Sequence, residues 1–162
     1  MKIILFFVVL FMAFCGSAQS NISSDDLTVL IGDWTGTLTY MDYSTNEPFS
    51  MPANVTVKMG KNENQLMLFN EYPNEPKANG KGKVTISRDE KSINGNPLIS
   101  RESLEGGDTQ FTTESTGKDN NEKALIRNIY VIGDKRFVIR KEVKFENSEE
   151  WLIRNEFNYT RD

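Results

Sequence analysis

The chain has 162 residues, with 19 basic and 23 acidic side chains for a net charge of −4, no histidine and a single cysteine. Its basic residues are interspersed with acidic ones along the sequence, which argues against a nucleic acid or an anionic membrane surface as partner, because both attract clustered Lys and Arg. Without histidine the chain cannot supply the usual zinc ligand sets or a Ser-His-Asp triad, so we expect no metal, no cofactor and no enzyme activity.

Residues 1–18 are predicted to be a secretory signal peptide. An apolar stretch follows the initial lysine, is too short to span a bilayer, which needs about 20 residues, and ends in small residues of the kind that signal peptidase reads. We expect cleavage to leave Gln19 as the N-terminus and the protein to be periplasmic or secreted, with no membrane-spanning segment after removal of the signal. The alternative is a lipid anchor on Cys15, which the bulky Phe14 before it disfavours.

Residues 19–162 are predicted to form one all-β domain that begins with a short helical turn around 27–31. After this turn, apolar and polar residues alternate in segments separated by Gly, Pro, Asn and Asp at intervals of about ten residues, which is typical of strands joined by tight turns. This spacing predicts an antiparallel up-and-down barrel of about 8–10 strands. The expected strands are 34–44, 53–59, 65–72, 83–88, 109–115, 123–132, 136–145 and 151–161, with weaker segments at 92–93 and 98–104.

The first and last strands are expected to pair with each other. Both are long and strongly patterned, and as the edges of an open sheet they would invite aggregation. Antiparallel pairing places Trp34 near Arg161, so the guanidinium can lie over the indole ring and close that end of the barrel. Arg161 shares its alternation with Ile153, Phe157 and Tyr159, the apolar face of the last strand.

Three arginines lie in the middle of predicted strands, where an inward-facing one could pair with a carboxylate ligand. Arg127 has the best claim to the interior, because it alternates with apolar residues, although the opposite face of its strand is equally apolar. Arg154 alternates with polar residues and is expected to be exposed, while the sequence does not assign Arg140 to either face. The apolar residues expected to face inward are Leu38, Val55, Val57, Val84, Ile86, Ile153 and Phe157.

Other polar motifs have simpler explanations than chemistry. The acidic pairs at 25–26 and 149–150 suit a helix start and a turn better than the paired carboxylates of a glycosidase. Residues 119–122 have side chains that calcium accepts, but they lack EF-hand spacing and fit a polar hairpin turn. The Gly-Lys repeat at 80–83 leads into a strand instead of a helix, so it lacks the helix dipole of a phosphate-binding loop.

The helical turn, the Gly32-Asp33-Trp34 motif at the first strand and Arg161 at the end of the last resemble the lipocalin and fatty-acid-binding-protein group of calycins, over residues 27–161. The chain departs from that group in lacking a Thr-Asp-Tyr motif, disulfides and the histidine of related haem-binding barrels. The resemblance implies a cavity for a small, mostly apolar molecule. Candidate ligand contacts are Tyr40, Arg127, Phe157 and Tyr159, and the residues expected to close the barrel are Gly32, Trp34 and Arg161.

Two functions follow from these expectations. In the first, an exported lipocalin-like barrel binds or carries a small apolar or amphipathic ligand. In the alternative, side chains fill the barrel and its loops serve as a protein-interaction or inhibitor module. A barrel of about eight strands is just wide enough for either arrangement, and the sequence leaves the ligand and the oligomeric state open.

Overall fold

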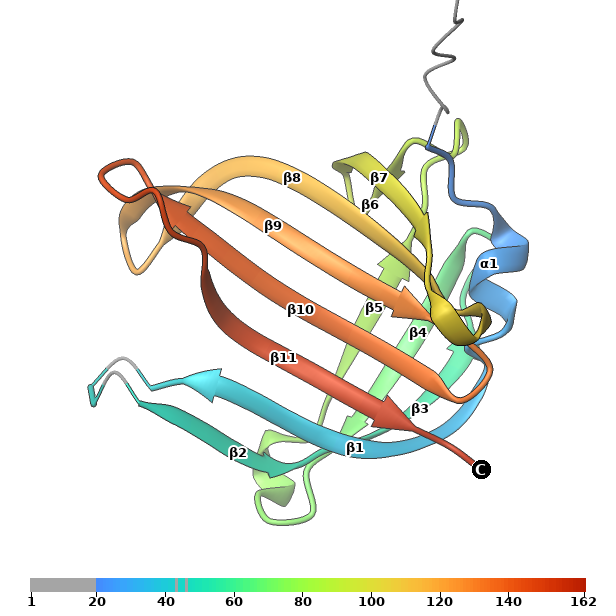
Figure 1. The fold of residues 1–162 in the computed structure, drawn as a ribbon. Coiled ribbons are helices and arrows are strands. Elements are labelled where there is room, and N and C mark those ends of the chain that lie inside the picture. The colour runs from blue at the N-terminus through green and yellow to red at the C-terminus, as the bar shows by residue number, and fades with distance from the viewer. Residues whose placement is uncertain (1–19, 43, 46) are drawn as a thin grey trace, which may run out of the picture.

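The computed structural model describes residues 20–42, 44–45 and 47–162, so the predicted signal peptide and Gln19 lie outside the described residues. Over this part of the chain it contains one short α-helix, two 3₁₀ turns and eleven strands (Figure 1). The elements are α1 (Ser24–Thr28), β1 (Gly32–Met41), β2 (Pro48–Pro52), β3 (Asn54–Met59), β4 (Gln65–Glu71), η1 (Pro76–Ala78), β5 (Gly80–Thr85), β6 (Ser92–Ile93), β7 (Asn96–Ser103), η2 (Glu105–Gly107), β8 (Thr109–Asp119), β9 (Glu122–Ile132), β10 (Arg136–Phe145) and β11 (Leu152–Thr160).

The strands form one antiparallel sheet that curls into a nearly closed barrel, which confirms the predicted fold class. Neighbouring strands follow the order β5-β4-β3-β1-β11-β10-β9-β8-β7-β6, and a bridge between Ile86 and Ile93 joins the two ends of this path. The first and last strands pair as expected, from Thr35 opposite Thr160 to Tyr40 opposite Asn155.

β2 was not expected, because Pro48-Phe49 was interpreted as a break in the chain after the first strand. It pairs with residues Thr37 to Met41 of β1 and is a side branch of the strand order given above. The N–H of Ala53 donates to the carbonyl of Gly36 on β1. Backbone groups alternate in direction along a strand, so those of Pro48 and Pro52 point away from β1, to the free edge of β2. A proline is tolerated there because its missing N–H breaks no ladder hydrogen bond.

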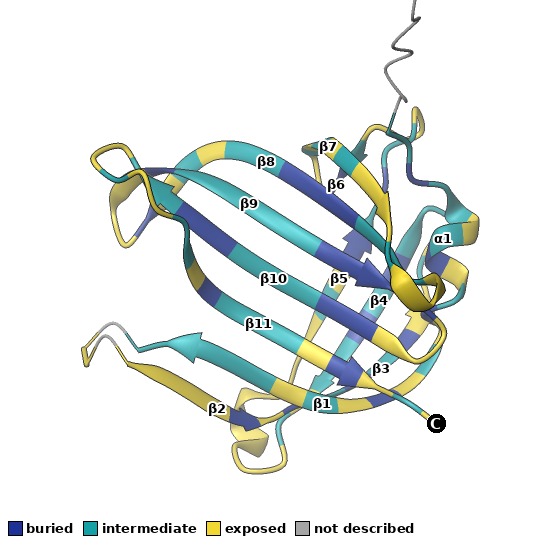
Figure 2. Cartoon of the chain, viewed as in Figure 1, coloured by how far each residue is buried: buried dark blue, intermediate teal, exposed yellow. Residues whose placement is uncertain are grey.

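The barrel has a closed end beside α1 and an open end opposite. β1, β8, β9 and β10 have 10 or 11 residues each, whereas β3, β4 and β5 have only 6 or 7. In Figure 1 the short strands lie behind only the half of the long strands nearest α1. In Figure 2 the middle stretches of β9, β10 and β11 are of intermediate burial, whereas their α1-side parts include the buried core positions. The packed core therefore fills the closed end.

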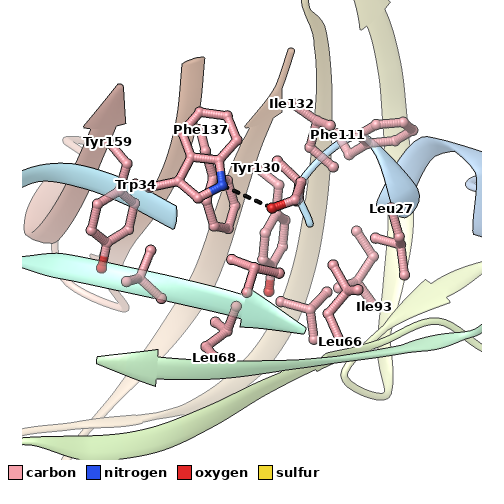
Figure 3. Packing of buried hydrophobic residues seen from close by; sticks show 14 of the residues in the cluster. Leu27, Trp34, Leu66, Leu68, Ile93, Phe111, Tyr130, Ile132, Phe137 and Tyr159 are labelled. Carbon is pink, nitrogen blue, oxygen red and sulfur yellow. Dashed lines mark hydrogen bonds between the residues drawn. The ribbon is translucent and has the colours of Figure 1, made fainter. Parts of the chain in front are cut away.

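Trp34 is the centre of this closed end and is 1% exposed, as its expected role requires. Its indole N–H donates a 2.8 Å hydrogen bond to the carbonyl of Leu30, just after α1 (Figure 3). Phe137 packs against its ring edge-on at 5.9 Å, and Tyr159 lies 5.6 Å beyond Phe137. The helical turn and the long strands are thus joined through one aromatic cluster.

Arg161 lies over the indole ring with its guanidinium 4.2 Å from the ring centre, which is the contact that the sequence predicted. The same guanidinium donates hydrogen bonds to the carbonyls of Val29, Ile31 and Asp134. Gly32 has a φ of +129°, a conformation that favours glycine, and a Cβ there would meet Arg161 at 3.4 Å. Arg161 closes the barrel by binding backbone oxygens of the segment that follows α1 and of the turn between β9 and β10.

A β-bulge in β11 overturns two expected positions. Lys141 lies opposite Asn155 but Glu142 lies opposite Ile153, so Arg154 is an extra residue in β11. A bulge reverses the alternation on one side of it. Ile153, expected to face inward, is 45% exposed, and Arg154, expected to be exposed, is buried.

Candidate functional site

A belt of polar side chains crosses the inner wall of the barrel. The strand register places its members opposite one another on five neighbouring strands. Strands alternate their faces, and the core residues Phe111 and Tyr130 lie two positions away on β8 and β9, so the belt faces inward. This polar belt consists of Tyr40, Asn155, Lys141, Asn128 and Thr113.

A row of apolar side chains lies beside the polar belt on the side of the closed end. Each member is two residues from a belt residue on the same strand, and the register again places neighbours opposite one another. This apolar row consists of Leu38, Phe157, Ile139, Tyr130 and Phe111. Leu38, Ile139 and Phe157 are only partly buried although they pack against the core, so the inner wall remains accessible at this level.

A pocket of about 470 Å³ opens beside the belt, where β1 and β11 separate. The pairing between these strands ends at Tyr40 and Asn155, while β11 continues alongside β10 as far as Leu152. The separation leaves a space between the β1–β2 hairpin and the start of β11. The pocket is lined by Tyr40, Met41, Asp42, Ser44, Lys141, Arg154 and Asn155.

The two cations that line the pocket, Lys141 and Arg154, share one carboxylate. Asp119 at the end of β8 accepts a 2.7 Å hydrogen bond from Lys141 Nζ and a 2.5 Å hydrogen bond from Arg154 Nε. Burial alone would raise the pKa of Asp119, but the hydrogen bonds and charges of Lys141 and Arg154 outweigh it and hold that pKa below its usual value. Asp119 therefore stays ionised and fixes the position of both cations.

Lys141 is the more accessible of the two cations. Its side chain is 30% exposed, against 9% for Arg154 and 3% for Asp119. Asp42 is the carboxylate that lines the pocket itself, and hydrogen bonds from Ser44 and from the backbone of Thr45 lower its pKa. The arrangement presents an ammonium group to the pocket beside neutral amide and phenol groups.

Arg127, the expected interior cation, lies on the outer face of the barrel. Its guanidinium binds Glu114, with hydrogen bonds of 2.8 and 2.6 Å, lies 3.6 Å from Glu142, and stacks 3.9 Å from the ring centre of Trp151. The expectation that it faces inward is wrong, because β9 turns its even-numbered residues, such as Tyr130, toward the core. The outer ion pairs satisfy Arg127 instead.

The other expected ligand contacts lie at different depths. Tyr40 is in the polar belt and on the pocket wall, with its ring 5.5 Å from that of Phe49. Phe157 belongs to the apolar row next to it. Tyr159 is 2% exposed, stacks on Phe157 and contacts the Phe137 ring at a tilt, and burial raises its pKa. Only Tyr40 among the candidates therefore lines the pocket directly.

Lys141, Arg154, Asn155 and Asp119 were not among the expected site residues. The inward position of Lys141 could have been predicted from the sequence, because Lys141 continues the alternation of the inward-facing Phe137 and Ile139 along β10. Asp119 falls in what was expected to be a turn, because the strand extends four residues further than its pattern indicated. Arg154 had no such signal, since the bulge that turns it inward leaves no mark in the alternation.

Among the described residues, no three His, Cys, Asp or Glu side chains gather closely enough to hold a metal ion. In the same part of the chain, no helix is both long and apolar enough to cross a bilayer.

The nearly closed antiparallel barrel is consistent with a calycin-like architecture. No family model matches the sequence, and no curated protein matches it. Among solved structures, the chain is similar to the crystal structure of Rv2717c from M. tuberculosis, at 12% sequence identity and a TM-score of 0.48, covering 88% of this chain and 99% of that one.

Proposed function

We propose that the protein is a lipocalin-like carrier that binds a small amphipathic molecule with an anionic head group at the open end of the barrel. The observation that supports this most directly is the partly exposed Lys141 on the wall of a pocket of about 470 Å³, next to the apolar row. The head group lies against Lys141, and the apolar part extends along Leu38 and Phe157 toward the core.

The expected affinity comes from two sources. A charge-assisted hydrogen bond to a partly buried ammonium is about twice as strong as a neutral one. Asp119 holds Lys141 in place before the ligand arrives, so little side-chain freedom is lost on binding. Apolar surface placed against the apolar row contributes roughly 25 cal/mol per Å² removed from water.

Export belongs to the same proposal. A carrier of a poorly soluble molecule is useful where that molecule must cross an aqueous compartment, and the apolar segment before residue 19 provides the route. The mass of the protein recovered after export tests this directly, with Gln19 expected at the N-terminus. A diacylglycerol group on Cys15 would contradict cleavage at that position and indicate an anchored protein.

Ligand binding is tested by titrating the purified protein with a fluorescent long-chain fatty acid and with an uncharged apolar dye. We expect both to bind, and Lys141→Gln to weaken the fatty acid about 10- to 100-fold, the loss of one hydrogen bond to a charged group. The dye affinity should stay within about twofold, because the dye makes no use of the charge.

Lys144→Gln is the matched control, since Lys144 lies on the same strand but on the outer face with Trp151. Arg127→Leu should likewise leave fatty-acid binding unchanged. Binding of neither probe by the unmodified protein would contradict the carrier and favour the filled barrel with an interaction or inhibitory role.

A further inference from the structure

Three lysines and two apolar side chains form a compact surface on the outside of the short strands. The register places Lys58 of β3 opposite Met67 of β4, and Met67 opposite Lys83 of β5. In the adjacent row, Phe69 of β4 lies opposite Lys81 of β5. The alternate residues of these strands are in the core, so these five face outward. We call this surface the lysine wall.

Two ammonium groups of the lysine wall lie beside one aromatic ring. Lys58 Nζ lies 5.4 Å and Lys81 Nζ 5.2 Å from the centre of the Phe69 ring. Within the described residues, the lysines that form ion pairs are Lys123 and Lys141, neither of which belongs to the lysine wall. The three lysines therefore form no ion pair, although Glu71 shares the outer face of β4 two residues from Phe69. Repulsion between the neighbouring ammonium groups is relieved when an anion approaches.

Acidic residues collect elsewhere on the molecule. A pocket of about 550 Å³ at the closed end is lined by Asp25, Asp26, Asp108 and Asp134 with only Lys135 as a cation. This group of aspartates is thus at a different place from the lysine wall. Since the Debye length is about 8 Å at physiological salt, a partner touching the lysine wall experiences its local positive charge more than the net charge of −4.

We propose that the lysine wall is the face by which the protein associates with an anionic lipid bilayer. The chemistry of the wall matches a surface that offers phosphates and an apolar layer together: the lysine heads reach the head groups, while Met67 and Phe69 contact the acyl boundary. A soluble polyanion would use the charges but leave the apolar pair unpartnered. The proposal runs against the expectation from the sequence that an anionic membrane surface is disfavoured.

The test is sedimentation with vesicles of phosphatidylcholine alone or mixed with phosphatidylglycerol. We expect binding to the mixed vesicles only, and its loss as salt is raised. Each lysine at such a surface contributes roughly a fivefold gain in partitioning, so the triple variant Lys58→Gln, Lys81→Gln, Lys83→Gln should bind about a hundredfold more weakly.

The matched control removes the same number of positive charges from other surfaces, by the changes Lys118→Gln, Lys123→Gln and Lys135→Gln. All six positions are exposed, so both variants should keep the thermal midpoint of the unmodified protein, which checks folding. Equal losses in the two triple variants, or no binding by the unmodified protein, would overturn the proposal. Binding to heparin or a single-stranded oligonucleotide without binding to vesicles would also overturn it, and would assign the wall to a soluble polyanion.

Discussion

Gly36 lies opposite Tyr159 across the seam where the first and last strands meet, with no room for a side chain between them. A Cβ on Gly36 would come within 2.1 Å of the carbonyl oxygen of Asn158 and 2.8 Å of the Cα of Tyr159. Both atoms belong to the backbone, so neither can move without shifting β11. The close approach of β1 to β11 therefore depends on glycine at this position.

Gly36→Ala should destabilise the protein by about 1–3 kcal/mol or more, the usual cost of forcing an extra group into a packed region. Urea denaturation followed by tryptophan fluorescence measures this. Gly80→Ala is the control, because its nearest atom would lie at an ordinary 3.7 Å from the new Cβ. Equal midpoints for the two variants would show that the seam tolerates the added atom.

Trp34→Ala should cost about 3–5 kcal/mol, the range for truncating a large aromatic side chain in a core. The loss includes the contacts with Phe137 and Arg161 and the hydrogen bond to Leu30. Thermal unfolding followed by circular dichroism measures it. Phe49→Ala removes a ring that is 47% exposed and should shift stability by no more than about 1 kcal/mol.

Asp119 should make the free energy of unfolding depend on pH in the acidic range. Its pKa is below the usual value in the folded protein, so its ionised form contributes stability above the unfolded pKa near 3.9, and that contribution is lost as pH falls through the folded pKa. Asp119→Asn should cost roughly 3 kcal/mol at pH 7, because Lys141 and Arg154 lose their shared carboxylate.

The cost of Asp119→Asn should begin to shrink as the pH falls below about 4, where Asp119 gains a proton in the unfolded chain, and should approach zero only below the lowered pKa of Asp119 in the folded protein. Unfolding free energies of both proteins measured between pH 2 and 7 check this. A difference that stays constant over that interval would mean that the ion cluster does not hold Asp119 in its charged form.

Much of the fold was predictable because alternation records which face of a strand is buried. That pattern located the long strands, and the pairing of first and last strands placed Arg161 over Trp34. The same signal could not assign Arg127, because both faces of β9 are apolar and only the register with its neighbours decides between them. For Ile153 and Arg154 the pattern was misleading, since one inserted residue reverses it.

The candidate pocket was less predictable than the fold. It arises where β1 and β11 separate, and that distance depends on strand lengths and twist more than on any local motif. The charges of the lysine wall were hidden for a related reason. Lys58 and Lys81 are 23 positions apart in the sequence, and only the pairing of both strands with β4 brings their ammonium groups to one ring.

The prolines of β2 should keep the protein from associating through its exposed strand edge. Pro48 and Pro52 direct their nitrogens to that edge and offer no N–H, so Ser50 is the one position of β2 between them that can donate to a docking strand. Replacing both prolines with threonine should produce dimers or larger species in size-exclusion chromatography with light scattering. The control Ser50→Thr raises strand propensity without adding an N–H, so it should have the same oligomeric state as the unmodified protein.

The seam between β1 and β11 also determines when the protein can fold. Thr35 is paired with Thr160, so the ring of strands cannot close until nearly the whole chain is present. Such distant pairings make folding slow, because the entropy of a long loop is lost before the contacts form. A ribosome-bound chain that ends before Leu152 leaves β1 and β10 without their shared partner. The barrel therefore cannot close while most of the chain is still being synthesised, which is the interval in which the proposed export would take place.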